Sequence, residues 1–468
     1  MAEEFDLVVT GGSIVTSRGV IPATVAVRNG HVAGVLDATE RPAAEDHLDA
    51  SGLHILPGII DTHVHLRDPG RPEREDFVSG TSAAAAGGVT TIIEMPISEP
   101  PVNSGEVLAR RAEQVQPRAL VDYALYGAAG RDNPDQIAAM AEAGAIAFKT
   151  FLHAPIPGRE HEFVGLTCTD EGALREIMAA TAETGLLHCF HCENNAMLER
   201  LEEKLRAAGR TDGMAHAESR PPVVEDAAVA EMLAIAAETG GRVQVVHMSS
   251  PLAAQLVNEA KARGVRVSAE TCPQYLFLTY DALREHGPYA KCNPALRSAA
   301  TVEEFWEYLR DGTIDVVGSD HSPFLDAEKA KGLEDIFLAP AGLPGLEPML
   351  PLMLDAVNQG RLSLPAVARL MSERAAELFG LPEKGRVEPG ADADLTLVDM
   401  NAEWIFDSGR SFSKAGGNMR AYDGRRLKGR VVSTFVRGEL VFHEGEITAS
   451  PGHGRFLRPV SVKERAMG

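Results

Sequence analysis

The chain has few cysteines and no arrangement of them that suggests cross-links. Five cysteines are an odd and sparse set for 468 residues, which argues against a disulfide framework and predicts reduced thiols. Cys189 and Cys192 form a Cys-x-x-Cys pair, but the chain holds no second pair of this kind. A zinc ribbon, which needs two such pairs, is therefore not expected.

Basic residues and long apolar segments are also scarce. The formal net charge is −22, which argues against nucleic acid and against an anionic membrane surface as partners. No run reaches the roughly 18 apolar residues of a membrane-spanning helix. The N-terminus Met1-Ala2-Glu3-Glu4 is acidic and lacks the apolar core of a signal peptide. We expect a soluble, cytoplasmic protein that acts on a small molecule.

The pattern along the chain predicts two domains of different architecture. A chain of 468 residues is too long for one compact core. Both ends are strand-like, with alternating runs at residues 5–9, 13–15, 24–27, 394–398, 431–437 and 440–443. Asn29-Gly30 and Arg437-Gly438 are the expected hairpin turns. We expect residues 1–56 and 385–468 to form a small β-sandwich, with the tail after Ser450 running over the surface.

The middle of the chain, residues 57–384, has a different sequence pattern. Apolar, β-branched runs alternate with Ala/Leu/Glu-rich helical stretches; the runs end near residue 60 and lie at 90–93, 146–150, 186–189, 243–247, 265–269 and 314–318. Such alternation predicts an α/β fold, a parallel (β/α)8 TIM barrel. We find no internal repeat, low-complexity tract or flexible linker.

Metal-ligand side chains follow several of these runs. His63 and His65 stand two apart in Asp61-Thr62-His63-Val64-His65, so both point to the same side of a strand. Four further candidates end or follow other runs: Lys149, His191, His247 and Asp320. A single histidine at a strand end is more often merely hydrogen-bonded, and a lone lysine is more often a surface amine. Six such groups where barrel enzymes place their chemistry predict a metal site.

These residues, with the motifs around them, resemble the binuclear amidohydrolase superfamily. The closer resemblance is to its cyclic amidohydrolases, namely dihydroorotase, allantoinase and hydantoinase or dihydropyrimidinase, and it covers nearly the whole chain. The motifs that carry it are His63-Val64-His65, Gly87-Gly88-Val89-Thr90-Thr91, Glu94-Met95-Pro96, His191-Cys192-Glu193-Asn194, the segment 270–276 beginning Glu270-Thr271-Cys272, Lys291-Cys292-Asn293-Pro294, Ser319-Asp320-His321 and the segment 390–395.

The resemblance implies a set of roles. His63, His65 and Asp320 would hold one divalent metal and His191 with His247 the other, while Lys149, carboxylated by CO₂, would bridge them. Zinc is the expected metal, since imidazole and carboxylate ligands suit it, although manganese, cobalt or iron fit the same ligands. A hydroxide shared by the metals would attack the ring carbonyl, and Asp320 would pass the proton to the leaving nitrogen.

The substrate is less well defined by the resemblance. Arg67 follows His65 by two residues and either contacts the substrate, as in the carboxylate clamp of dihydroorotases, or pairs with Asp68 or Glu73. Ile97 stands where dihydroorotases have an asparagine, and Ala154 stands where hydantoinases have a tyrosine. The remaining substrate contacts that we expect are His153, Asn293 and His321. Allantoinase-like hydrolysis of a ureide is therefore the leading hypothesis, with hydantoinase or dihydroorotase activity as the alternative.

A different class of function is also compatible with this scaffold. Relatives that have lost their metal ligands serve as non-catalytic assembly proteins, but all six ligand positions are intact here, which favours the enzyme. A weaker alternative is an acyclic amidase or deaminase on the same barrel. We expect a homo-oligomer, either a dimer or a tetramer.

Overall fold

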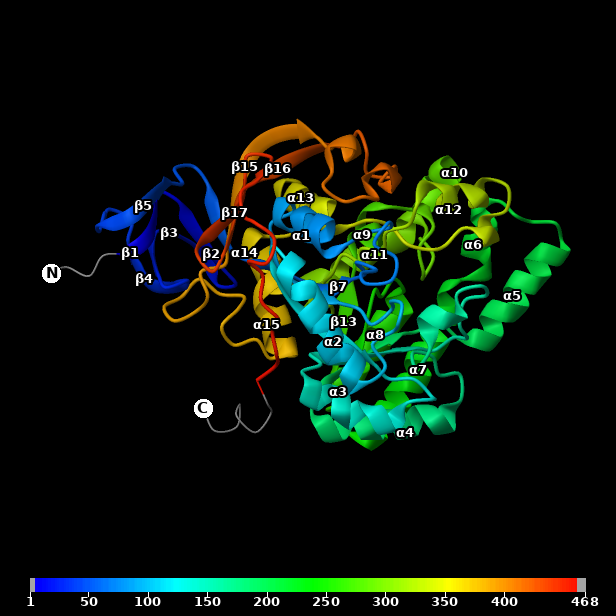
Figure 1. Cartoon of the computed structure of the whole chain (residues 1–468). Coiled ribbons are helices and arrows are strands. Elements are labelled where there is room, and N and C mark those ends of the chain that lie inside the picture. The colour runs from blue at the N-terminus through cyan, green and yellow to red at the C-terminus, as the bar shows by residue number, and fades with distance from the viewer. Residues whose placement is uncertain (1–4, 461–468) are drawn as a thin grey trace.

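Two sheets organise the chain, one made by its ends and one by its middle (Figure 1). The computed structural model describes residues 5–460. The blue N-terminal strands and the orange-to-red C-terminal strands lie together on one flank, and the segments between them form the other. The predicted arrangement of a barrel beside a sandwich built from both chain ends is confirmed.

Eight parallel strands form the barrel in chain order. They are β7 (Ile59–Val64), β8 (Val89–Glu94), β9 (Asp122–Ala128), β10 (Ala147–Phe151), β11 (Leu187–His191), β12 (Arg242–Val245), β13 (Val267–Thr271) and β14 (Val316–Val317). A parallel bridge between Val64 and His321 brings the end of the last strand beside the first. Residues of β8 and β9 are buried throughout, as expected when helices cover one face of a parallel sheet and a packed core the other.

Helices separate the strands, and four of the eight that cover the barrel begin at a side-chain cap. Those that cover the barrel are α1 (Phe77–Ala86), α2 (Gly105–Val115), α3 (Ile137–Ala143), α4 (Glu171–Thr184), α7 (Pro222–Thr239), α8 (Pro251–Ala262), α11 (Ala299–Arg310) and α13 (Leu346–Asn358). Asp76, Ser104, Asp170 and Ser298 each accept a backbone N–H in the first turn of a helix. Such side chains replace hydrogen bonds that the first turn cannot make internally.

The other α-helices lie in the loops at the carboxyl ends of the strands and after the last one. They are α5 (Asn195–Ala207), α6 (Gly213–Ser219), α9 (Pro273–Phe277), α10 (Tyr280–His286), α12 (Asp326–Ala330), α14 (Leu364–Ala368) and α15 (Arg374–Phe379). Within residues 5–460, none of the helices has the length and apolar character that crossing a membrane would require.

The second sheet has ten strands and curls around its own core. Its order is β18 (Glu446–Ile447), β17 (Glu439–His443), β16 (Arg426–Val436), β15 (Leu395–Ile405), β6 (His54–Pro57), β2 (Ser13–Thr16), β3 (Gly19–Arg28), β1 (Phe5–Thr10) and β5 (Ala44–Asp49), with β4 (His31–Asp37) paired to β3. Val25 and Ile55 from the N-terminal part pack in one cluster with Leu397 and Phe435 from the C-terminal part. Neither end of the chain could bury these side chains alone.

Three strands were not anticipated from the sequence, namely β9, β5 and the two-residue β18. Strand β9 reads Asp-Tyr-Ala-Leu-Tyr-Gly-Ala; it has no β-branched residue, and its alanines and glycine are disfavoured in strands, although its two tyrosines favour one. Strand β5 is mostly exposed and polar, and it lies at the edge of its sheet. Its position comes from parallel pairing with β1, a contact that local sequence does not encode. The tail runs over the barrel surface as expected, with Phe456 bridged to Tyr123; residues 461–468 lie outside the described chain.

A buried charge cluster joins the two sheets. The Lys384 ammonium lies 2.6 Å from Asp122, 2.8 Å from Asp392 and 2.7 Å from Asp394. Arg437 pairs with Asp122 as well. Burial alone would lower the pKa of Lys384, but the three carboxylates raise it well above its ordinary value. Asp122 begins β9 in the barrel, while Asp394 directly precedes β15 in the other sheet, so the lysine holds the two sheets together.

We expect Lys384→Met to destabilise the protein strongly. The change removes the central cation and leaves buried carboxylates without it, a loss that costs about 3–5 kcal/mol in comparable buried pairs. Thermal unfolding followed by circular dichroism measures it. Lys428→Met is the matched control, since Lys428 and its partner Glu403 are largely exposed and such pairs contribute less than about 1 kcal/mol. Equal melting temperatures for the two variants would contradict the role of Lys384.

Candidate metal centre

The side chains expected to bind metal come together at the carboxyl ends of the barrel strands. His63 lies on β7, Lys149 on β10 and His191 at the end of β11. His65, His247 and Asp320 follow β7, β12 and β14. The four histidines and Asp320 line one cleft, and Lys149 lies behind it, close enough to interact electrostatically with His65, His191, His247 and Asp320.

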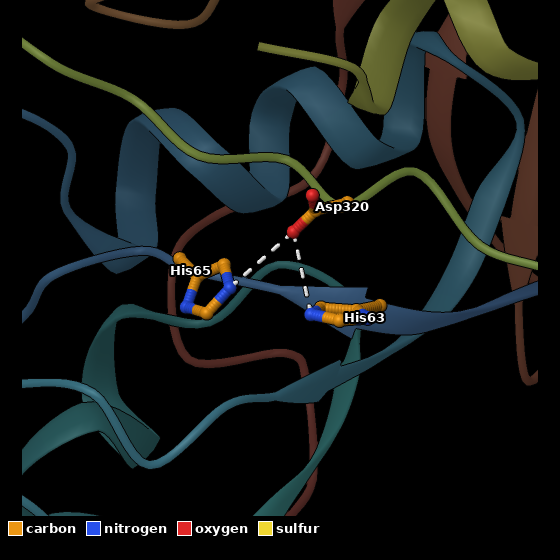
Figure 2. Close-up of side chains that lie close together, drawn as sticks. All are labelled: His63, His65 and Asp320. Atoms are coloured by element: carbon orange, nitrogen blue, oxygen red, sulfur yellow. Dashed lines mark ion pairs between the residues drawn. The ribbon is translucent and has the colours of Figure 1, made fainter. Parts of the chain in front are cut away.

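The first group consists of His63, His65 and Asp320 (Figure 2). One oxygen of Asp320, Oδ1, lies 3.3 Å from Nε2 of His63 and 3.5 Å from Nε2 of His65. Ligand atoms of the three residues all lie within 4.8 Å of one another. Two imidazole nitrogens and a carboxylate oxygen that face one point form a donor set suited to a divalent cation such as zinc.

The second group consists of His191 and His247. Nδ1 of His191 lies 2.9 Å from Nε2 of His247, so the two rings direct nitrogens toward the same point. Burial is the main reason that the pKa of each ring is held well below its ordinary value. Both imidazoles are therefore neutral at physiological pH, which is the form that binds metals.

Lys149 has the environment that carboxylation of an amine requires. Its side chain is fully buried, and its Nζ has no hydrogen-bond partner within residues 5–460. Burial lowers the pKa of Lys149 to about 8, so an appreciable fraction of the amine is uncharged and nucleophilic near neutral pH. An unpartnered buried amine is costly, and a carbamate bound to cations on either side would satisfy it. The donor set therefore fits two divalent metals.

Carboxylates behind the histidines orient the rings, and the sequence interpretation assigned no role to them. Glu270, which is fully buried, lies 2.8 Å from Nδ1 of His63 through one oxygen and accepts from Thr62 through the other at 2.6 Å. Glu193 lies 2.7 Å from Nε2 of His191. Contacts of this kind select which ring nitrogen carries the proton and which faces the metal. Glu193 and Glu270 both lie within motifs that carry the family resemblance, and this was the only sign of them in the sequence.

Three residues of the cleft have left-handed backbone conformations. The φ angles are 62° at Arg67, 41° at His247 and 48° at Asp320. Each such angle costs a non-glycine residue on the order of 1–3 kcal/mol, a strain that clusters at functional sites. The rest of the fold holds these side chains toward the cleft against that cost.

Arg67 does not pair with either of the carboxylates considered from the sequence. Asp68 instead pairs with Arg118 and Glu73 with Arg71. Arg67 lines the cleft, and its Nη2 donates to Oγ of Ser322 at 2.9 Å.

The wider surroundings of the Arg67 guanidinium are charged and aromatic. Its Nη1 lies 3.7 Å from Glu162, and the group stacks on Phe324 at 5.2 Å. Nε and Nη1 have no hydrogen-bond partner within residues 5–460, so two donors remain. Burial lowers the pKa of Arg67 to about 9.

The other expected substrate contacts divide into two groups. His153 and Asn293 line the cleft. His153 donates through Nδ1 to the carbonyl of Ala154 at 2.6 Å, and its ring packs edge-on against His191. His321 does not belong to the cleft lining: it is fully buried, and its Nδ1 accepts from the backbone N–H of Gly345 at 3.1 Å. A contact between His321 and a substrate stays a prediction.

An apolar wall and a second arginine complete the cleft. The wall consists of Ile97, Phe151, Ile156 and Phe163, and Arg159 lies beside it. Arg159 is held by Glu162, with Nε 2.9 Å from Oε1. No role in the cleft was assigned from the sequence to Ile156, Phe163 or Arg159, whereas Ile97 and the neighbourhood of Phe151 were considered. The loop 152–166 that carries the others has no strand or metal-ligand signal.

Comparison with known proteins agrees with this geometry. The model of the amidohydrolase family matches residues 54–441. The chain is 39% identical to an allantoinase of Deinococcus radiodurans over 460 residues, which are 98% of this chain and 99% of that protein. It is 36% identical to an L-hydantoinase of Paenarthrobacter aurescens over 458 residues, 97% of this chain and 98% of that protein.

A solved structure extends the likeness to the fold. The L-hydantoinase (dihydropyrimidinase) from Arthrobacter aurescens superposes with a TM-score of 0.93 at 36% identity, covering 97% of this chain and 100% of that one. Matches of this extent include both sheets and the whole cleft. The chain belongs to the amidohydrolase family, in its cyclic amidohydrolase branch.

Proposed function

We propose that this protein opens the ring of a cyclic ureide by hydrolysis at a binuclear metal centre, as an allantoinase-like enzyme. The observation that carries the proposal is the pair of converging ligand groups around a buried lysine amine that lacks a hydrogen-bond partner within residues 5–460. The relatives named allantoinase and L-hydantoinase support hydrolysis of a cyclic amide. Hydantoinase or dihydropyrimidinase activity is the second candidate, and dihydroorotase activity the third.

The residues divide between two metals. His63, His65 and Asp320 would hold one, His191 and His247 the other, and the Lys149 carbamate would supply one oxygen to each. When bound, two divalent ions, for which zinc suits these ligands, would polarise a substrate carbonyl and lower the pKa of water. Family membership supports divalent metal binding, while the identity of the ions and the carbamate belong to the proposal.

Asp320 is the residue placed to move the proton. Its Oδ1 faces the two histidines of the first group, which leaves Oδ2 for the attacking water. Burial raises the pKa of Asp320 above its ordinary value, and cations bound beside the carboxylate would act in the opposite direction. It takes a proton from water as the ring carbonyl is attacked and delivers it to the ring nitrogen as the C–N bond breaks.

The surroundings of Arg67 favour an uncharged ring over a carboxylate-bearing one. Glu162 lies 3.7 Å from the guanidinium and balances part of its charge, and Arg159, which also lines the cleft, pairs with the same carboxylate. The N–H groups of Arg67 that have no partner within residues 5–460 can donate to a neutral ureido or ring oxygen. Ile97, which is 4% exposed in the cleft wall, offers no polar group to complete a carboxylate clamp. An allantoin-like ureide fits these contacts better than dihydroorotate.

The oligomeric state and the cellular location of the protein are further parts of the proposal. That the chain assembles into a dimer or tetramer and works in the cytoplasm remains a proposal, for which the oligomeric state in solution is the direct measurement. A non-catalytic assembly role is disfavoured, because allantoinase and hydantoinase relatives align over nearly the whole chain.

Metal analysis tests the binuclear centre directly. We expect about two divalent ions per chain in carefully purified protein and a mass increase on Lys149 corresponding to CO₂. Lys149→Ala should lose both activity and metal, because the bridging oxygens are gone, with partial rescue by a short carboxylic acid. Full activity in excess chelator, without bound metal, would refute the centre.

The proton transfer predicts a large kinetic effect at Asp320. Asp320→Asn should lower turnover by about 10²–10⁴-fold, since the amide cannot accept the proton from water. Asp320 is also a proposed ligand, so metal content is measured in the same samples. A variant that keeps two metals and turns over at the wild-type rate would show that another group moves the proton.

Substrate choice is tested at Arg67. Allantoin, dihydroorotate, dihydrouracil and hydantoin are assayed for ring opening with wild type and Arg67→Lys. We expect allantoin to be the best substrate and its turnover to fall in the variant, because lysine cannot reproduce the planar donor group. Dihydrouracil and hydantoin, whose rings carry neither a ureido nor a carboxylate substituent, should be affected least. Efficient hydrolysis of dihydroorotate that is selectively lost in Arg67→Lys would overturn this choice.

A further inference from the structure

The two ligand groups are supported by buried carboxylates in different charge environments. Glu270 lies behind His63 and Glu193 behind His191, each hydrogen-bonded to the ring nitrogen that faces away from the other ligands. Glu270 is 0% exposed and Glu193 is 1% exposed. Because both are shielded from water, the charge beside each carboxylate determines how strongly it acts on its histidine.

Glu270 keeps its negative charge without a basic partner. Its contacts are the ring of His63, the hydroxyl of Thr62 at 2.6 Å, the amide of Gln244 at 3.4 Å and the backbone N–H of His247 at 3.3 Å. Within residues 5–460, no lysine or arginine forms an ion pair with it. Glu270 thus supports His63 without a neutralising ion pair in the described part of the chain, and it also contacts the backbone of His247.

Glu193 is neutralised by an arginine. The Oε2 atom that lies 2.7 Å from Nε2 of His191 also accepts from Nη1 of Arg220 at 2.5 Å. The carbonyl of Arg220 accepts in turn from Nη1 of Arg297 at 2.5 Å, and Arg297 pairs with Glu225 at 3.0 Å. This network holds Arg220 in place beside the carboxylate.

The same network reaches the second histidine of that group. Glu225 accepts from both the backbone N–H and the hydroxyl of Ser249, at 2.8 and 2.6 Å, and Ser249 follows His247 by two residues. Arg297 also donates to the Ser249 hydroxyl at 3.1 Å. One set of contacts thus braces both His191 and the segment that carries His247.

The hydrogen bond to Glu193 also decides which nitrogen of His191 is free. A carboxylate accepts, so Nε2 of His191 carries the proton, and the lone pair on Nδ1 points toward Nε2 of His247 at 2.9 Å. In the first group the assignment is reversed, because Glu270 accepts from Nδ1 of His63 and leaves Nε2 facing Asp320. Each carboxylate therefore selects the tautomer that can bind a metal.

We propose that Glu193 is a positioning residue for His191, and that its neutralisation by Arg220 makes the His191–His247 position the more weakly held of the two metal positions. This inference rests on the binuclear centre proposed above. The position of His63 and His65 has the Asp320 carboxylate as a ligand, and Glu270 behind it has no ion-pair partner among the lysines and arginines within residues 5–460. The position of His191 and His247 has two neutral imidazoles, and the charge of Glu193 behind it is balanced by Arg220. Removal of metal should thus proceed in two steps, beginning at His191 and His247.

Graded chelation of zinc-loaded wild type tests the order of release. Zinc per chain is measured by mass spectrometry, and the occupancy of each position is measured from anomalous scattering of crystals equilibrated with the same chelator. We expect zinc to leave the His191–His247 position first, at a chelator strength at least about tenfold lower, the smaller end of the usual effect of outer hydrogen-bond partners. Simultaneous loss, or loss from the His63 side first, would overturn the inference.

Three variants separate positioning from a merely structural role. Glu193→Gln should weaken zinc at the His191–His247 position by about 10–100-fold and leave the other position unchanged. Arg220→Gln should retain or raise zinc affinity there, because Glu193 then keeps its full charge. Asp315→Asn is the matched control; Asp315 is a buried carboxylate paired with Lys261 and Arg374 just before β14, and its change should alter neither step.

The outcomes distinguish this inference from the proposed centre. Equal weakening of both positions by Glu193→Gln, or weaker zinc binding in Arg220→Gln, would contradict the role given to Glu193 and Arg220 alone. A wild-type chain that binds no zinc or other divalent ion would contradict the binuclear centre, and this inference with it.

Discussion

The hydrogen bond between a buried carboxylate and the outer nitrogen of a ligand histidine is the contact on which the geometry of the cleft depends. An imidazole has two nitrogens, and a buried one cannot leave both to water. At His63 and His191, a glutamate takes one nitrogen and thereby aims the other at the centre. His65 and His247 have no such support at Nδ1 within residues 5–460, so each pair of histidines contains one ring that is fixed by a carboxylate.

The chemistry and the stability of the protein reside at different places along the strands. The candidate ligands lie on or just after the carboxyl halves of β7, β10, β11, β12 and β14, whereas the Lys384 cluster involves Asp122 at the amino end of β9. This separation is general for barrels of this type. It lets residues such as His247 and Asp320 keep unfavourable backbone angles, because the strain is offset by packing and ion pairs elsewhere.

Most of the barrel strands and all six candidate ligands could be predicted from the sequence. Apolar β-branched runs mark seven of the eight strands, and the ligand types stand at or just after their ends. Strand β9 was missed because it has no β-branched residue, and its alanines and glycine offset the strand preference of its two tyrosines. The roles of Glu193 and Glu270 were missed for a different reason. Glu270 contacts His63 across 207 positions of the chain, and Arg220 reaches Glu193 across 27; no local pattern encodes such pairings.

Arg67 shows why substrate choice was the hardest property to read from the sequence. Its spacing from His65 was consistent with a carboxylate clamp, and its charge alone would support one. The structure adds Glu162, which approaches Arg67 while also binding Arg74 at 3.3 Å and Arg159. Three guanidinium groups thus share one carboxylate at the rim of the cleft. Part of the positive charge is thereby balanced within the protein, and Nε and Nη1 of Arg67 keep N–H groups without a hydrogen-bond partner among residues 5–460. Under the proposed function these groups would donate to the neutral oxygens of a ureide, and the loop that carries Glu162 would influence which ring the cleft accepts.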